Sequence, residues 1–320
     1  MQGIIKIFAG LAGMKLARQV CEQLSIPPGE ALVGRFPDGE AQIQLKENVR
    51  GADVFIINPL CSPAENLLDM LFLTDASQGS SAGRITLVIP YLGWNRQDRK
   101  DKPRMATSAE VVISILANSG CDRVLLMDVH SEPTISIFRT HDIITDHLYG
   151  SHITLEYLRS ILRPNSVIAT PDAGGSRRAR AYARRLGLPT VVCDKERSTE
   201  SGHIAEGSVL VLGDVRGKDV IFVDDMIDTA GTLYADAKAV RALGAERILA
   251  VATHALFSGN ALERLDESLV DEVIVTDTIP HEPDALKTSR VKITTLSVAG
   301  YLAKAIAKIN RDESLSDMFL

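Results

Sequence analysis

Residues 217–244, GKDVIFVDDMIDTAGTLYADAKAVRALG, contain the pattern that decides the fold class. Val220 to Val223 is an apolar, β-branched run typical of a buried strand, and Asp224 and Asp225 follow at its carboxyl end. The next segment, DTAGT at 228–232, leads into a helical pattern that ends at a glycine. A strand, a loop and a helix start in succession predict a ligand site, because ligands of open α/β sheets bind at the carboxyl ends of strands.

The residues of this loop suit a phosphorylated sugar. Free N–H groups at a helix start favour phosphate, and Gly231 allows the backbone to approach the anion. Thr229 and Thr232 supply hydroxyl donors, and the carboxylates suit ribose hydroxyls or a hydrated cation. An alternative is that Asp and Thr only cap the helix. The adjacent acidic pair exceeds what capping needs.

Short β-branched runs recur along the chain with helical patterns between them. Such alternation predicts parallel sheets with helices on their faces, so the expected fold class is α/β. The predicted strands are residues 53–58, 84–90, 123–128, 166–170, 219–223 and 247–253.

The two halves of the sequence resemble one another. GADVFIINP at 51–59, followed by a helix and RITLVIP at 84–90, is echoed by GKDVIFVDD at 217–225, a helix and RILAVATH at 247–254. A duplication explains the similar order and spacing, although any two strand–helix–strand units look alike. A break near Arg163-Pro164-Asn165 leads us to expect two tandem domains, 1–150 and 151–320.

Composition narrows the function classes. The 320 residues include 45 % apolar and 24 % charged residues, which is typical of globular proteins, and the net charge is −6. This charge argues against a broad nucleic-acid surface. The cysteines stand singly, and no run of about 18 apolar residues occurs. We therefore expect a cytoplasmic protein with neither a nucleic-acid nor a membrane partner.

Four further stretches carry candidate binding groups. FPDGE at 36–40 is an aromatic, a turn and two carboxylates, and is also ordinary turn chemistry. YLGWNRQDRK at 91–100 offers cations for a polyphosphate, or a solvated charged face. MDVHS at 127–131 contains a histidine that is either a ligand or structural. TPDAGGSRR at 170–178 has the composition of a phosphate or metal loop.

These stretches, together with DKER at 194–197 and DDMIDTAGT at 224–232, occur in the order and at about the separations found in class I ribose-phosphate pyrophosphokinases. The sequence resembles this family from IFAG at residue 7 to the terminal SLSDMF. DDMIDTAGT alone resembles a motif that the family shares with phosphoribosyltransferases. The upstream stretches favour the kinase.

The resemblance implies two phosphoribosyltransferase-like domains, each a mainly parallel sheet flanked by helices. It implies that ATP and ribose 5-phosphate react with Mg²⁺ to give 5-phosphoribosyl 1-diphosphate and AMP, in a homo-oligomer that is a hexamer or a part of one. The implied ATP contacts are Phe36, Asp38, Gly39, Glu40, Arg96 and Gln97. The implied metal ligands are His130 and Asp172. The implied ribose 5-phosphate contacts are Arg197, Asp224, Asp225, Asp228, Thr229, Ala230, Gly231 and Thr232.

The resemblance also implies that Lys195 and Arg197 are catalytic. The lysine ammonium and the planar arginine guanidinium suit the charge that develops on transferring phosphate oxygens. The polar segment that contains both residues suits a flap that closes over the reactants. The alternative is an ordinary loop. Glu196 departs from the usual Asp-Lys-Arg-Arg, and Arg104 to Ser108 depart from the usual Arg-Glu-Pro-Ile-Thr.

Two other functions fit parts of the sequence. A non-catalytic subunit of this family is weakly favoured by Glu196, and an ordinary phosphoribosyltransferase by the acidic loop alone. Three histidines, 141, 147 and 152, lie close together in a stretch about three residues longer than usual. They lack the paired spacing of a zinc site, so we expect no second metal site there.

Overall fold

The computed structural model describes residues 3–100, 102–171, 175–195, 209–282 and 284–318. These residues form two compact units. The first comprises Met1–Gly150, Thr278–Pro280 and Ser297–Leu320, and the second Ser151–Asp277 and His281–Leu296. The predicted division into 1–150 and 151–320 differs from these units chiefly in its last segment, because Ser297–Leu320 packs within the first unit.

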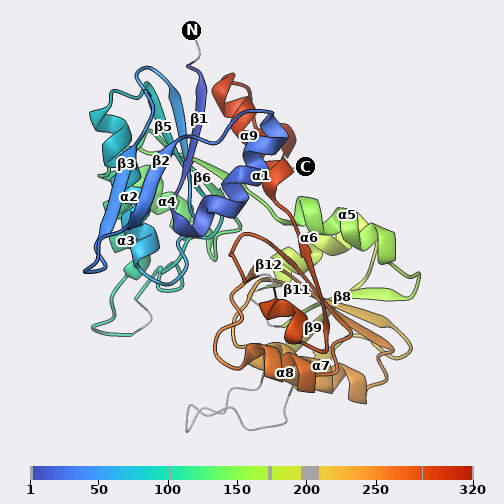
Figure 1. Ribbon diagram of the computed structural model, residues 1–320. Helices are drawn as coiled ribbons and strands as arrows, with labels where there is room; N and C mark the ends of the chain where they lie inside the picture. Colours follow the sequence, from blue (N-terminus) through green and yellow to red (C-terminus); the bar gives the residue numbers. More distant parts are fainter. Residues whose placement is uncertain (1–2, 101, 172–174, 196–208, 283, 319–320) are drawn as a thin grey trace. The chain divides into compact units, whose positions relative to one another are not determined.

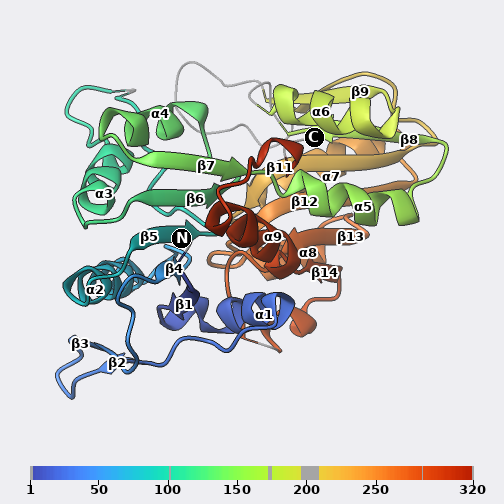
Figure 2. The ribbon, with the colours of Figure 1, turned by 90° about the horizontal axis from the view of Figure 1, so that it is seen from above.

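The first unit is built on a parallel five-stranded sheet with the order β1-β4-β5-β6-β7. Figure 2 shows these strands side by side. Their bounds are Ile5–Ala9, Asp53–Ile57, Arg84–Ile89, Arg123–Met127 and Ile144–Leu148. A separate antiparallel hairpin consists of β2 (Ala31–Arg35) and β3 (Ala41–Leu45).

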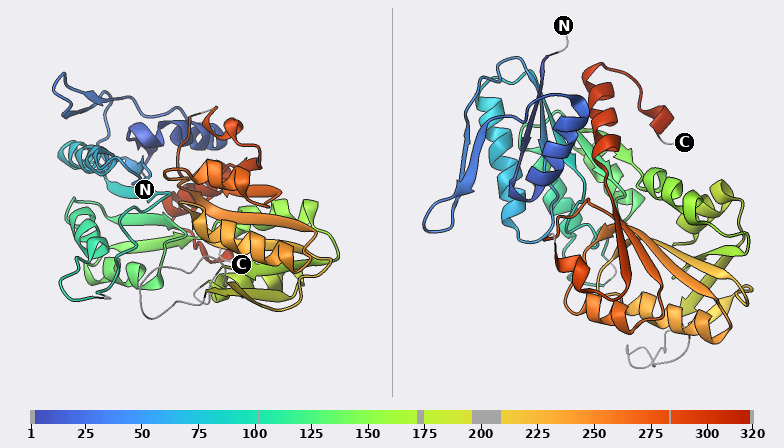
Figure 3. Two further views of the ribbon diagram at one scale, coloured as in Figure 1. Left: turned by 90° about the horizontal axis from the view of Figure 1, so that it is seen from below. Right: turned by 45° about the vertical axis from the view of Figure 1, so that its right-hand side comes forward.

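Helices cover both faces of the first sheet (Figure 1). Val54, Ile56 and Leu87 on one face join a core with residues of α2 (Glu65–Gly79), α3 (Ser108–Ala117) and α4 (Glu132–Thr140). The other face is covered by α1 (Met14–Leu24) and α9 (Ala299–Asn310), which pack against each other (Figure 3). Continuous apolar strands such as β4 are therefore buried on both sides, as parallel sheets require.

The second unit is built on a seven-stranded sheet with the order β10-β9-β8-β11-β12-β13-β14. Among the described strands of this sheet, only β10 and β9 pair in the antiparallel direction. From β8 to β14 the bounds are Ser166–Thr170, Thr190–Lys195, Val209–Leu212, Asp219–Ile227, Arg247–Ala255, Glu272–Thr276 and Lys292–Leu296.

Strand β11 shows how the second sheet contacts its helices. Val220 and Phe222 join a core with α7 (Gly231–Ala242) and α8 (Ala261–Glu267). The intervening Ile221 and Val223 join a second core with α5 (Ser151–Ile161) and α6 (Ser176–Leu186). Alternate side chains of a strand point to opposite faces, so β11 is buried on both. The predicted α/β class with two mainly parallel sheets is confirmed.

Equivalent backbone hydrogen bonds recur at the amino ends of the two sheets. Gly51 N–H donates to Ser81 O at 2.9 Å, and Gly217 N–H donates to Gly244 O at 2.8 Å. An aspartate carboxylate accepts from the second residue of a central strand in both units. These pairs are Ile85 N–H to Asp122 Oδ2 and Ile248 N–H to Asp271 Oδ2, both at 2.7 Å. The echo in the sequence therefore corresponds to a repeated hydrogen-bonding frame.

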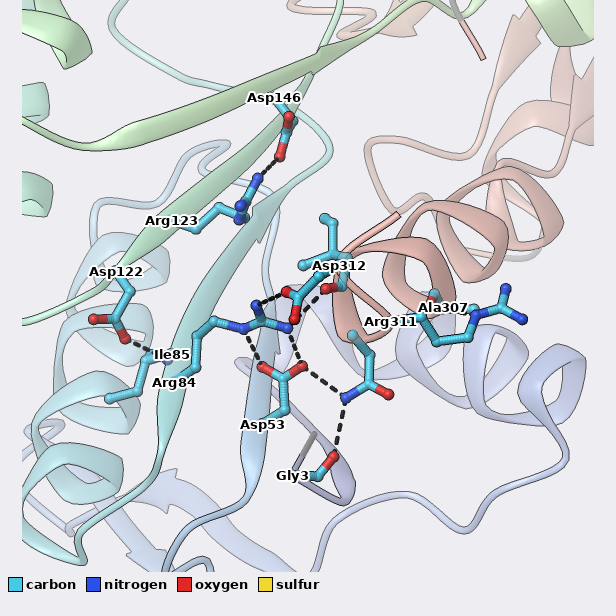
Figure 4. A network of polar contacts seen from close by, with 12 residues as sticks. Gly3, Asp53, Arg84, Ile85, Asp122, Arg123, Asp146, Ala307, Arg311 and Asp312 are labelled. Carbon is cyan, nitrogen blue, oxygen red and sulfur yellow. Dashed lines mark hydrogen bonds and ion pairs between the residues drawn. The ribbon is translucent and has the colours of Figure 1, made fainter. Parts of the chain in front are cut away.

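Charged side chains close the amino edge of the first sheet (Figure 4). Arg84 donates to both carboxylate oxygens of Asp53, at 2.9 and 2.6 Å, and to Asp312 at 2.8 Å. Asn310, at the end of α9, also donates to Asp53 at 2.9 Å. These bonds attach the last helix to the first sheet.

No helix among the described residues combines the length and apolar character needed to cross a bilayer.

Candidate active site

The acidic pair lies inside strand β11 rather than after it. The sequence predicted a strand ending at Val223, whereas β11 continues to Ile227, because its parallel pairing with β12 extends past Asp224. The prediction was too short because pairing between strands is a tertiary property that a local apolar run does not show. The side chain of Asp224 is 40 % exposed and that of Asp225 is 7 % exposed.

Arg178, from α6, pairs with both carboxylates. Its Nη1 lies 3.3 Å from Asp224 Oδ1 and 3.5 Å from Asp225 Oδ1. Removal from water and the neighbouring Asp225 together raise the pKa of Asp224 to about 8, although Arg178 opposes this shift. Crowded carboxylates of this kind are stabilised by a cation or by hydroxyl donors. The chemistry therefore suits a hydrated metal ion or ribose hydroxyls.

Residues 228–230 connect β11 to α7 (Figure 1), and Gly231 and Thr232 begin the helix; we call residues 228–232 together the turn. Ala230 has a φ of 58°, in the left-handed region, and Gly231 is the first residue of α7. Within the described part of the chain, the amide groups of Thr229, Ala230 and Gly231 donate to no other group. The first turn of α7 contains no acidic residue. Available N–H donors at a helix start form a site for an anion.

The predicted ATP contacts of the FPDGE stretch form the tip of the β2–β3 hairpin. Phe36 N–H donates to Glu40 O at 2.8 Å, and Gly39 N–H donates to Phe36 O at 2.9 Å. Asp38 Oδ1 accepts from Glu40 N–H at 3.0 Å. All of these side chains are exposed, and Phe36 is 44 % exposed. An exposed aromatic ring at a hydrogen-bonded turn suits contact with a planar base.

Arg96 and Gln97 lie in the loop that follows β5, and both are exposed. Two bonds attach this loop to the start of α3: Ser108 Oγ donates to Trp94 O at 2.7 Å, and Ala109 N–H donates to Gln97 O at 3.3 Å. The cations of the loop are thus held at the carboxyl edge of the first sheet.

His130 follows β6 and is exposed. The residues before it are anchored to the end of β7. Asp128, with a φ of 38°, accepts a hydrogen bond from Gly150 N–H at 2.7 Å, and Val129 N–H donates to His147 Nε2 at 3.1 Å. These bonds define the path of the chain into His130.

Three predicted groups fall at or beyond the edge of the described residues. Asp172 and Arg197 lie outside them, and Lys195 is described only as the last backbone position of β9, opposite Val209. Among the described residues, no group of three or more His, Cys, Asp or Glu has a geometry that could hold a metal ion.

The second unit therefore brings together Asp224, Asp225 and the turn 228–232, whereas the hairpin tip, the Arg96 loop and His130 belong to the first. Sequence reasoning gave no separate role to Arg178, which lies in the quoted TPDAGGSRR stretch and pairs with the acidic residues. A doubled arginine after a glycine-rich loop was the available signal.

Comparisons with known proteins match nearly the whole chain. A family model described as the N-terminal domain of ribose phosphate pyrophosphokinase matches residues 5–120, and one described as a phosphoribosyl synthetase-associated domain matches residues 205–320. A ribose-phosphate pyrophosphokinase of Shewanella oneidensis is 45 % identical over 318 residues, covering 98 % of each chain. That of Wolinella succinogenes is 43 % identical over 316 residues, covering 98 % of this chain and 99 % of its own.

A solved structure is similar in fold over the same extent. The crystal structure of phosphoribosylpyrophosphate synthetase from Mycobacterium smegmatis has a TM-score of 0.87 and 32 % identity, and the match covers 97 % of this chain and 99 % of that one.

Proposed function

This chain belongs to the ribose-phosphate pyrophosphokinase family, and from this premise we propose how its own residues share the reaction. The enzyme transfers the diphosphoryl group of ATP to the 1-hydroxyl of ribose 5-phosphate, which gives 5-phosphoribosyl 1-diphosphate and AMP for nucleotide biosynthesis. The order of the sequence motifs supports the class I form of this enzyme.

The turn 228–232 holds the phosphate of ribose 5-phosphate in this proposal. The observation that carries it is the set of available N–H groups at the start of α7, with the hydroxyl of Thr229 beside them and no acid in the first turn. Asp224 and Asp225 accept hydrogen bonds from the ribose hydroxyls. Arg178 limits the repulsion between the two carboxylates.

ATP binds residues of the first unit. Phe36, at the exposed tip of the hairpin, contacts the base, and Asp38, Gly39 and Glu40 complete that turn. Arg96 and Gln97 contact the polyphosphate from the loop after β5.

Mg²⁺ is the metal that we propose. The proposed ligands are His130, from the first unit, and Asp172. Carboxylate oxygens are ligands that this ion prefers. When bound, the ion neutralises charge on the phosphate oxygens. Asp224, whose pKa is raised beside Asp225, supports a cation near the second sheet.

Lys195 and Arg197 are the proposed catalytic residues. The ribose 1-hydroxyl attacks the β-phosphorus, AMP leaves with the bonding electrons, and negative charge spreads over the transferring oxygens. A lysine and an arginine beside these oxygens stabilise that charge more in the transition state than in the bound substrates.

We extend the proposal to the setting of the enzyme: a cytoplasmic homo-oligomer, a hexamer or a part of one, with neither a nucleic-acid nor a membrane partner. Size-exclusion chromatography with light scattering measures the oligomer directly. A monomer at working concentration contradicts this part alone.

Release of AMP from ATP in the presence of ribose 5-phosphate and Mg²⁺ tests the activity. We expect AMP and 5-phosphoribosyl 1-diphosphate in equal amounts. No AMP at ample protein concentration would favour a non-catalytic subunit. An ordinary phosphoribosyltransferase has no use for ATP, so ATP binding that weakens in Phe36→Ala excludes it.

A further inference from the structure

Arg264, on α8, reaches the turn that precedes α7. Its Nη1 donates to the backbone carbonyl of Thr229 at 3.0 Å. The side chain is half-buried, and none of the sequence motifs includes it. The bond therefore links a helix with no assigned role to the middle of the proposed phosphate turn.

This bond controls the direction of an N–H group. A trans peptide is planar, and its C=O and N–H point in opposite directions. With the Thr229 carbonyl held toward Arg264, the N–H of Ala230 in the same peptide points away from Arg264. That group is one of the amides that donate to nothing else in the described chain, so its hydrogen bond is available to an anion.

The turn needs such a restraint. The φ of 58° at Ala230 places a residue with a Cβ in the left-handed region, which costs about 1–2 kcal/mol. A backbone conformation of this kind persists only where surrounding contacts hold it. The bond from Arg264 acts on the peptide directly before Ala230.

The charge of Arg264 also lies at the turn. A Cβ built on Gly231 would be 3.5 Å from Arg264 Nη1 and 3.8 Å from Thr229 Oγ1, so the guanidinium and the hydroxyl flank the same glycine. No carboxylate of the described residues pairs with Arg264, although Glu263 and Glu267 share its helix. An arginine without a counter-ion beside a turn of available amides favours an anion there.

We propose that Arg264 is a positioning residue for ribose 5-phosphate. It holds the Thr229–Ala230 peptide so that its N–H faces the phosphate, and its charge strengthens the attraction of the turn for that phosphate. The inference rests on the proposed function of residues 228–232 and adds a residue outside them.

The test compares Arg264→Met and Arg264→Lys with the wild type in the AMP-release assay. We expect Arg264→Met to raise the KM for ribose 5-phosphate about tenfold, with kcat and the KM for ATP within about twofold of the wild type. Arg264→Lys keeps the charge and one donor, so it should restore part of the loss.

Arg241→Met is the matched control. Arg241 also bonds backbone carbonyls, those of Ala245 at 3.1 Å and Leu269 at 2.9 Å, but from the opposite end of α7. Its loss should lower the Tm without changing the KM for ribose 5-phosphate. Equal changes in the two variants, or a rise in the KM for ATP as large as that for ribose 5-phosphate, would mean a structural role and overturn the proposal.

The outcomes separate this inference from the proposed function. An inactive wild-type enzyme overturns both. An active wild type with an unchanged KM in Arg264→Met overturns the role of Arg264 alone. If Arg264→Met does not fold, Arg264→Gln decides, because this variant loses the charge and shortens the side chain, and an unchanged KM for ribose 5-phosphate there would overturn the role of Arg264.

Discussion

The loops after β4 and β11 start from equivalent places in two similar sheets, yet only the second has the chemistry of an anion site. Counted from the first residues of the two strands, NPLCSPAEN at 58–66 corresponds to DDMIDTAGT at 224–232. The helices that follow, α2 and α7, begin at the corresponding residues Glu65 and Gly231. The two helices therefore begin at corresponding positions, although β11 continues through Asp224 to Ile227 whereas β4 ends at Ile57.

The residues at the helix starts differ in charge and in backbone conformation. An alanine precedes each helix, but φ is −61° at Ala64 and 58° at Ala230. The first turn of α2 contains Glu65, whose charge repels an anion, and Pro63 lacks an N–H. The first turn of α7 has neither feature.

The polar residues of the two loops point to different partners. Asn58 is fully buried and donates to Asn66 O at 2.6 Å, and Asn66 in turn donates to Cys61 O at 3.0 Å. The corresponding Asp224 keeps 40 % of its side chain exposed. The first loop uses its polar groups to hold itself together, whereas Asp224 stays partly exposed and pairs with Arg178 of α6. The fold thus sets where a loop lies, and a few side chains decide whether it binds.

Exchanging the loops should have the largest effect. With residues 228–232 replaced by SPAEN, the single carboxylate moves from position 228 to position 231 in the first turn of α7, proline removes the N–H donor at position 229, and the segment has one hydroxyl fewer. We expect kcat/KM for ribose 5-phosphate to fall more than about 100-fold, measured by AMP release. Binding of ATP, measured by calorimetry, is the control and should be unchanged. Activity within about tenfold of the wild type would mean that the loop is not the phosphate site.

Gly231→Glu tests the charge alone. The nearest atoms to a Cβ at Gly231 lie at 3.5 and 3.8 Å, and its φ is not in the left-handed region, so a side chain fits. The new carboxylate should raise the KM for ribose 5-phosphate about 30-fold, although an acid in the first turn stabilises a helix by about 0.3–1 kcal/mol. The paired control Gly231→Ala should change the KM less than about twofold. Similar losses in both variants would point to space rather than charge.

The ion pairs at the amino edges of the two sheets should affect stability but not catalysis. Arg84 pairs with Asp53 on the preceding strand, whereas the corresponding Arg247 pairs with Glu272 on the following one. Glu272 also accepts hydrogen bonds from Tyr157 and Thr294, each at 2.7 Å. Glu272→Gln should cost about 1.5 kcal/mol and lower the Tm by about 4 °C.

The stability difference between the wild type and Glu272→Gln should depend on pH, because the pKa of Glu272 is shifted in the folded protein. Burial raises that pKa, but hydrogen bonds from Lys292, Tyr157 and Thr294 outweigh burial and lower it overall. The carboxylate therefore stabilises the protein above its ordinary pKa, and this contribution is lost as the pH falls through the lowered one. The exposed Glu263→Gln is the control. A change in the KM for ribose 5-phosphate in Glu272→Gln would contradict a purely structural role.

Asp224→Asn should show the smallest effect, with the opposite sign. The pKa of Asp224 is raised to about 8, so ionising it in the folded protein costs stability, and that cost grows as the pH rises from about 4 to about 8. Asparagine, the residue at the corresponding position 58, should raise the Tm at pH 8. The rise should be only about 2 °C, because solvent screens the charge of a half-exposed side chain. The difference should vanish toward pH 4. A lower Tm at pH 8 would mean that the pairing with Arg178 dominates.

Local patterns in the sequence predicted the α/β class, the positions of six of the strands, the duplicated pattern and the location of DTAGT between a strand and a helix. They did so because these features are local: periodicity, turn residues and helix starts act over a few positions. The comparisons confirmed that the chain belongs to the ribose-phosphate pyrophosphokinases, a family that the sequence resembles in motifs spread along its length, and the class I form stays a prediction.

The partners of these residues depend on the tertiary structure. Pairing with β12 extended β11 past Asp224, Arg178 reached the acidic pair from α6, and Arg264 reached Thr229 from α8. The last segment, Ser297–Leu320, joined the first unit rather than the second. Each of these contacts joins residues far apart in the chain, and such contacts depend on the packing of whole helices and strands, which no local pattern specifies.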